Sequence, residues 1–194
     1  MKYLRLFESF EDIDKICRIY NIKNYTINTD GSIDIKADIE TDEYIDLSII
    51  GLIKLPIKFN IVTGDFDCSF NNLITLEGSP KEVNGYFDCS NNKLTSLKYA
   101  PRIIRGGFDC SNNDIKTFEY FPNFIKEDFF CTDTLLWYIW ILFRDWTKIE
   151  LLNDFDIFRD EDTDEPAIVM ERLNDFLLTI GRKSVEKVDG YKNI

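Results

Sequence analysis

The sequence predicts an α+β fold: a solenoid of about five 21-residue rungs that share a parallel sheet. We expect a helix and a hairpin to cap one end, and helices to cap the other. Apolar residues recur every 21 positions from Tyr44, asparagines recur at the same spacing, and both patterns stop outside the repeat rows. The chain divides into an N-terminal cap (1–40), a repeat region (41–134) and a C-terminal helical cap with a tail (135–194).

Rows of 21 residues starting at Tyr44 align without gaps. Alternation around residues 87–90 is typical of a strand, with phenylalanine and the small apolar cysteine inward. A row this short holds a strand and an irregular return rather than a full helix, so we expect rungs roughly 4.8 Å apart. The two strongest apolar columns are Ile45, Phe66, Phe87, Phe108, Phe129 and Leu47, Cys68, Cys89, Cys110, Cys131.

Asn71, Asn92 and Asn113 occupy one column at the turn after the strand. An inward asparagine there can hydrogen-bond the backbone of neighbouring rungs, which satisfies polar groups that a turn would otherwise bury unpaired. The first row has Ile50 in this column and the last has Thr134. Asparagine therefore occurs only in inner rows, as expected when the outer rows act as caps.

Residues outside the rows predict the caps. Residues 9–20 are an amphipathic helix that Ser9 can cap, followed by a hairpin with an Asp30-Gly31 turn. After the rows, 135–146 is an apolar helix. A second helix is expected from Pro166 to Ile180, closed by Gly181, and the final ten residues are expected to be mobile.

Composition narrows the function classes. A net charge of -12 disfavours nucleic acid and anionic membranes as partners. The chain has no histidine, so it lacks the usual general base and the commonest zinc ligand. No nucleophile or phosphate-binding motif is present. We expect no enzyme activity and no cofactor, and we interpret the five cysteines as reduced thiols of a cytoplasmic protein.

Outward positions of the strands are candidate binding residues on a concave face. Stacked carboxylates about 5 Å apart repel by about 0.8 kcal/mol in water and roughly 3 kcal/mol at an effective dielectric of 20. Three interpretations remain open: a stripe for a basic partner, a soluble residue copied with each repeat, or a calcium site. The candidates are Asp46, Asp67, Asp88, Asp109, Ser69, Ser90, Ser111, Asp65, Tyr86, Phe70 and Phe130.

The row FDCSNNKLTSL resembles the leucine-rich repeat, with phenylalanine and cysteine in two of its leucine positions. The opening KYLRLFESF, the unit GYFDCSNNKLTSLKYAPRII and the tail LFRDWTKIELLNDFDI are similar to short leucine-rich-repeat proteins of tailed bacteriophages and bacteria. The resemblance implies a phage-encoded, cytosolic interaction protein without catalytic activity. The resemblance does not identify binding residues in this chain.

We therefore expect a non-catalytic module that binds a host or viral protein with a basic surface through its acidic concave face. A narrower version is an inhibitor of a host defence system. The alternative is an internal or accessory virion structural protein, for which Leu6-Phe7-Glu8 resembles the L-x-E site that some phage maturation proteases cut.

Overall fold

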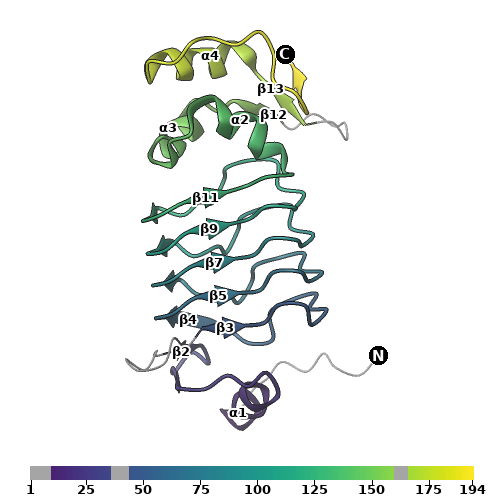
Figure 1. Cartoon of the computed structure of the whole chain (residues 1–194), viewed down its shortest axis with the longest axis vertical. Coiled ribbons are helices and arrows are strands. Elements are labelled where there is room, and N and C mark those ends of the chain that lie inside the picture. Colours follow the sequence, from purple (N-terminus) through teal and green to yellow (C-terminus); the bar gives the residue numbers. More distant parts are fainter. Residues whose placement is uncertain (1–9, 36–43, 160–165) are drawn as a thin grey trace.

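The computed structural model describes residues 10–35, 44–159 and 166–194. This part of the chain is a mixed α+β structure with one fully parallel sheet, one mainly parallel sheet, a small third sheet and four α-helices. The strands stack along the long axis, and the helices lie at its two ends (Figure 1). Ser9 and the tripeptide Leu6-Phe7-Glu8 lie outside the described residues.

The first sheet contains one short strand from each repeat row. Every strand pairs in parallel with the strand 21 residues later, which confirms the register predicted from the rows. In spatial order these strands are β3 (Ile45–Asp46), β5 (Phe66–Asp67), β7 (Phe87–Asp88), β9 (Phe108–Asp109) and β11 (Phe129–Phe130).

The returning segments form a second sheet, whereas the sequence predicted one sheet and an irregular return. The returns of the repeat rows place a fully buried apolar residue at each strand end, so they are extended and can pair with their neighbours; these residues are Val62, Val83, Ile104 and Ile125. Only the β1–β2 pair in this sheet is antiparallel. The strands are β1 (Tyr25–Ile27), β2 (Ile33–Ile35), β4 (Phe59–Val62), β6 (Glu82–Val83), β8 (Ile103–Ile104) and β10 (Phe124–Ile125).

The core lies between the two sheets. Successive rings of Phe66, Phe87, Phe108 and Phe129 have centroids 5.8, 5.7 and 5.5 Å apart. The repeat cysteines beside them are fully buried and unpaired, as predicted. The phenylalanines that recur every 21 residues therefore form a continuous stack of rings along the molecule.

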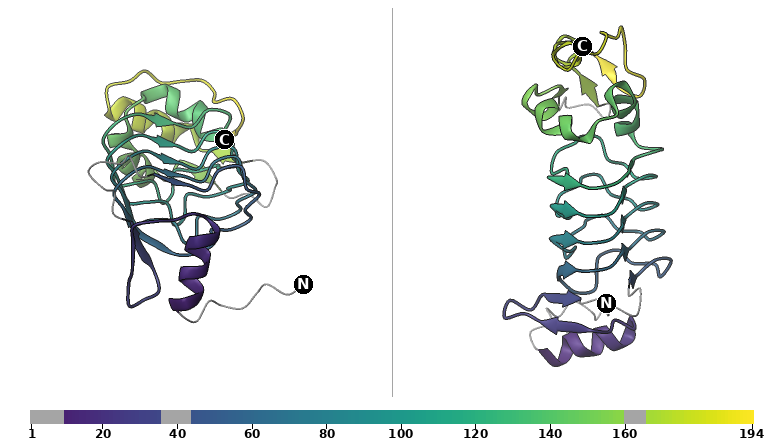
Figure 2. Two further views of the ribbon diagram at one scale, coloured as in Figure 1. Left: turned by 60° about the horizontal axis from the view of Figure 1, so that its bottom comes forward. Right: turned by 60° about the vertical axis from the view of Figure 1, so that its left-hand side comes forward.

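The N-terminal cap follows the prediction in its described part. Helix α1 (Phe10–Ile19) buries Ile13, Ile16 and Cys17, and the hairpin turns at Asp30-Gly31. The Asp30 carboxylate accepts hydrogen bonds from the backbone and the hydroxyl of Ser32, which fixes the turn. The hairpin extends the second sheet, and α1 lies at the same end of the molecule (Figure 2).

The C-terminal helices are α2 (Leu135–Phe143), α3 (Ile149–Asp154) and α4 (Met170–Thr179), with a 3₁₀ turn at Trp146–Lys148. The predicted apolar helix corresponds to α2, which ends at Phe143 where the backbone of Arg144 is left-handed. Gly181 follows α4 with a φ of 76°, as expected for a helix-ending glycine.

Two predictions for this end are wrong. Pro166 does not start a helix: Ala167–Ile168 form strand β13, and α4 begins at Met170. The last residues belong to the fold, because β14 (Lys192–Asn193) pairs with β13, which also pairs with β12 (Phe158–Arg159). Although this segment is mostly polar, it contains Tyr191, whose side chain is buried. The Tyr191 hydroxyl donates a hydrogen bond of 2.8 Å to the backbone carbonyl of Lys116.

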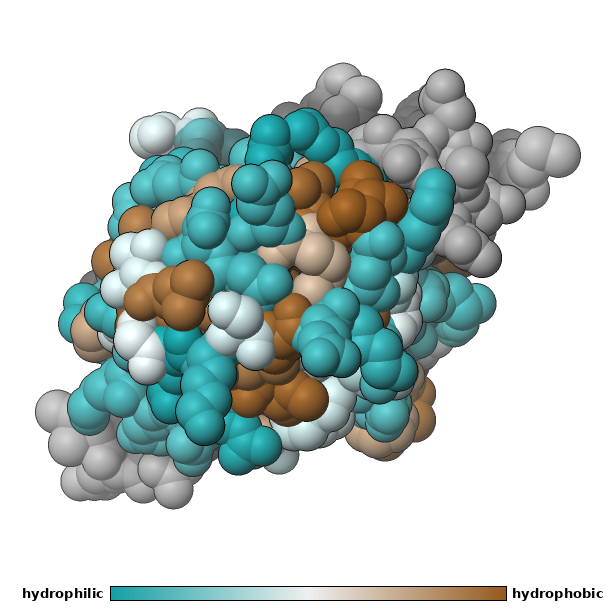
Figure 3. All heavy atoms as spheres, turned by 90° about the horizontal axis from the view of Figure 1, so that it is seen from above, coloured by the Kyte–Doolittle hydropathy of each residue, from teal (hydrophilic) through white to brown (hydrophobic). Residues whose placement is uncertain are grey.

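Seen from the C-terminal end, the surface is mainly hydrophilic with smaller hydrophobic areas between (Figure 3). None of the helices in the described part of the chain combines the length and the apolar character that crossing a membrane requires.

Candidate interaction surface

Four aspartates form a column on the outer side of the first sheet. The strand register places Asp46 beside Asp67, Asp67 beside Asp88 and Asp88 beside Asp109. Asp46 is exposed and the other three are partly exposed. Phe130 pairs with Asp109 and continues the column as an exposed aromatic side chain. The structure thus brings these five predicted site residues together.

Each aspartate also has a structural partner that the sequence interpretation missed. Its Oδ1 accepts a hydrogen bond from the backbone N–H of the serine two residues later. The four N···O distances lie between 2.8 and 2.9 Å. The aspartates therefore stabilise the turns at which the strands of the first sheet end, in addition to presenting charge.

The serine column is not part of the exposed face, and the prediction for Ser69, Ser90 and Ser111 is wrong in this respect. Their exposed fractions are only 3, 4 and 5%. The turn closed by the aspartate folds each serine inward. There the hydroxyl of Ser90 accepts a hydrogen bond from Asn91, and that of Ser111 accepts one from the backbone of Thr132. These serines support the turns between rungs.

The ionised form of Asp88, in the middle of the column, is electrostatically unfavourable. Burial raises the pKa of Asp88 above its ordinary value, and the charges of Asp109 and Asp67 raise it further. Hydrogen bonds from Ser90 oppose this rise. The ionised column thus carries a repulsion that neighbouring positive charges would relieve.

Asp65 and Tyr86 border the column on one side. The carboxylate of Asp65 accepts a hydrogen bond of 2.6 Å from the backbone N–H of Tyr86. The half-buried Tyr86 ring lies against Gly107, where an added Cβ would come within 2.6 Å of a ring carbon. Burial raises the pKa of the Tyr86 phenol, and Asp109 and Asp88 add to this effect. Tyr86 is thus a neutral aromatic residue beside the acidic column.

Phe70 borders the column on the other side, in an apolar group that the sequence interpretation missed. Ile49, Ile50, Ile53 and Ile74 are exposed in the same two rungs as Phe70. Comparison of the rows could have revealed them, because the third row has asparagine or threonine at the corresponding positions.

The thiols of the cysteine column are buried in the core. Cys68, Cys89 and Cys110 are fully buried, and burial raises the pKa of each thiol well above its ordinary value. In residues 10–35, 44–159 and 166–194, no three acidic or cysteine side chains are grouped so that they could hold a metal ion.

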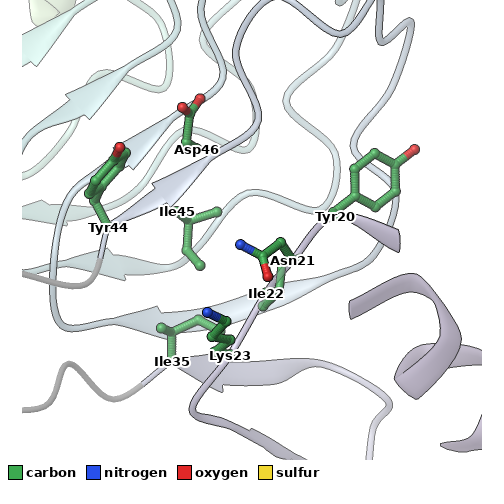
Figure 4. Close-up of a pocket in the computed structure, with 8 residues that line it drawn as sticks. All are labelled: Tyr20, Asn21, Ile22, Lys23, Ile35, Tyr44, Ile45 and Asp46. Atoms are coloured by element: carbon green, nitrogen blue, oxygen red, sulfur yellow. The ribbon is translucent and has the colours of Figure 1, made fainter. Parts of the chain in front are cut away.

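A surface pocket lies at each end of the first sheet, and each has a volume of about 390 Å³. The first lies between the turn that follows α1 and strand β3, with Lys23, Tyr44 and Asp46 in its lining (Figure 4). The second is lined by Asp133, Trp137 and their neighbours. The aspartate column therefore reaches a hollow at its N-terminal end.

Comparison of the chain with protein-family models, curated proteins and solved structures finds no match.

Proposed function

We propose that this chain is a leucine-rich-repeat solenoid of a tailed bacteriophage that binds another protein in the host cytoplasm without catalysing a reaction. Its partner presents lysine or arginine side chains. They meet the aspartate face, by which we mean Asp46, Asp67, Asp88 and Asp109 with the bordering Asp65, Tyr86 and Phe130.

The in-register aspartate column carries this proposal. Its carboxylates are already oriented by backbone hydrogen bonds, so binding would cost them little conformational entropy. Burial raises the pKa of Asp88, and repulsion from Asp109 and Asp67 raises it further; that repulsion would fall when cationic groups approach. Tyr86 and Phe130 add aromatic area of the kind that contributes strongly to interfaces.

The decisive variant is the triple substitution Asp67→Asn, Asp88→Asn and Asp109→Asn. Asparagine retains a side-chain oxygen that can accept the serine N–H, so the substitution removes charge while preserving the turn. The matched control is Glu77→Gln, Asp114→Asn and Glu119→Gln, which removes three negative charges from exposed positions outside the column.

Affinity capture from host lysate, followed by mass spectrometry, compares the two triple variants with the unaltered chain. We expect a basic protein to be captured by the unaltered chain and by the control, and to be lost from the column variant. Equal capture by all three would overturn the aspartate face as the binding surface.

A further inference from the structure

The turn after each strand of the first sheet contains one residue with left-handed backbone geometry. In the five rungs these residues have φ values between 52 and 58°. Asparagine and aspartate adopt this geometry readily, and the last three rungs use Asn91, Asn112 and Asp133. The first two rungs use Ile49 and Phe70, a β-branched and a bulky residue for which such a φ is strained.

These strained side chains are not buried. Ile49 is 76% exposed and Phe70 is 59% exposed, so packing against the described part of the chain does not explain why apolar residues stand there. The same two rungs also expose Ile53 and Ile74, where the next two rungs have Thr95 and Lys116. In these turns the first two rungs thus have apolar residues where the next two rungs have polar ones.

The exposed apolar residues lie on two adjacent rungs. The backbone N–H of Ile49 donates to the carbonyl of Ser69, next to Phe70, at 3.2 Å. The N–H of Ile74 likewise donates to Ile53, at 3.4 Å. With Ile50 these residues form what we call the apolar patch: Ile49, Ile50, Ile53, Phe70 and Ile74. Its area is on the order of several hundred Å², a size at which surface patches are often functional.

We propose that the apolar patch binds an amphipathic basic segment of the partner protein, with its apolar side chains on the patch and its lysines or arginines on the aspartate column. Charge complementarity selects this occupant. Asp46 and Asp67 each lie three residues before Ile49 and Phe70, so the patch is continuous with the acidic column. This inference rests on the proposed function and names the chemistry of its partner.

A second copy of the chain fits the patch less well. Two copies that met at this surface would bring their aspartate columns together, in a protein whose net charge is already -12. Like charges placed opposite each other at an interface oppose association. If the chain were found to self-associate through the patch, that result would contradict the proposal.

The test uses the variant Ile49→Asn and Phe70→Asn, which installs the residue that this chain uses at the same turn in later rungs. The matched control is Tyr99→Asn and Tyr120→Asn, which replaces two other exposed aromatics with left-handed backbones, φ 73 and 61°. Because asparagine relieves strain, we expect the patch variant to melt at the same temperature or roughly 2–4 °C higher. A lower melting temperature would show that Ile49 and Phe70 stabilise the monomer, which contradicts the proposal.

The binding probe is a fluorescein-labelled 18-residue helical peptide with leucine on one face and lysine on the other. Fluorescence anisotropy at physiological salt compares it with a scrambled peptide of the same composition. We expect the unaltered chain and the tyrosine control to bind the amphipathic peptide saturably. The patch variant should bind it at least tenfold more weakly, and the scrambled peptide should bind weakly to all three.

If the patch variant binds the amphipathic peptide as tightly as the unaltered chain does, the proposal is overturned. It is also overturned if the unaltered chain binds the scrambled peptide as tightly as the amphipathic one. In either case charge alone would explain the binding. A dimer in sedimentation velocity that the patch variant converts to monomer would assign the patch to a second copy. If the aspartate triple variant loses a captured partner that the patch variant keeps, the proposed function stands and this inference fails.

Discussion

The side-chain nitrogen of Asn92 donates a 3.0 Å hydrogen bond to the backbone carbonyl of Cys68, which belongs to the preceding rung. Its side-chain oxygen accepts from the backbone N–H of Leu73 in that same rung, at 2.9 Å. Asn71 and Asn113 repeat this arrangement in their own rungs. One asparagine per turn thus links each inner rung to the one before it, as the sequence predicted.

We expect Asn92→Ala to lower the free energy of unfolding by about 1–3 kcal/mol, because it leaves buried backbone groups without partners. Urea denaturation followed by circular dichroism measures this loss. The control is Asn72→Ala, at the exposed position next to Asn71 in the preceding rung, which should change stability by less than about 0.5 kcal/mol. Equal stability of the two variants would contradict a stabilising role for the asparagine ladder, by which we mean Asn71, Asn92 and Asn113.

Gly107→Ala should destabilise the chain by about 1–3 kcal/mol, because its Cβ would overlap the Tyr86 ring and force it to move. The companion variant combines Gly107→Ala with Tyr86→Ala, which removes the ring. A double-mutant cycle from thermal unfolding should show that the alanine at 107 costs less once the ring is absent. A purely additive cycle would mean that Tyr86 is not what requires glycine there.

Asp88→Asn should raise the melting temperature at neutral pH. The pKa of Asp88 is higher in the folded chain than its ordinary value, so the folded state binds its proton more tightly and ionisation reduces stability. This cost is fully present above the folded pKa and disappears as the pH falls to the unfolded value near 3.8.

The stabilisation by Asp88→Asn should therefore shrink on acidification through that range, and also in high salt. Asp46→Asn, at the exposed end of the column with one flanking aspartate instead of two, should give a smaller gain. Thermal melts of both variants between pH 3.5 and 7 check these trends. A gain for Asp88→Asn that does not depend on pH would argue against a cost of ionising Asp88, and one that does not depend on salt would argue against repulsion within the column.

The cysteines should not react in the folded protein. All five thiols are buried, and burial raises the pKa of Cys17 to about 11 and that of Cys131 to about 12. With a thiol-specific chromogenic reagent at pH 8, we expect no fast phase in the native chain and five equivalents in guanidinium. A fast-reacting thiol under native conditions would show that part of the cysteine column opens to solvent.

Much of the repeat region could be predicted from the sequence. Spacing alone gave the register of Phe66, Phe87 and Phe108, the inward cysteines and the asparagine ladder, because identical rows that stack must place identical residues side by side. The aspartate column followed from the same register. The role of its carboxylates as acceptors for the serine N–H groups did not, because strand alternation placed the serines outside and could not show where the strands end.

Only the tertiary structure decided the remaining features. Extended returns pair with one another to make the second sheet, a consequence of stacking that no single row reveals. Ile168 and Tyr191, far apart in the sequence, become part of one C-terminal core through β13 and β14. The sequence by itself determined which residues repeat. The structure determined which are exposed, because burial depends on the turns and on neighbouring rungs rather than on the period.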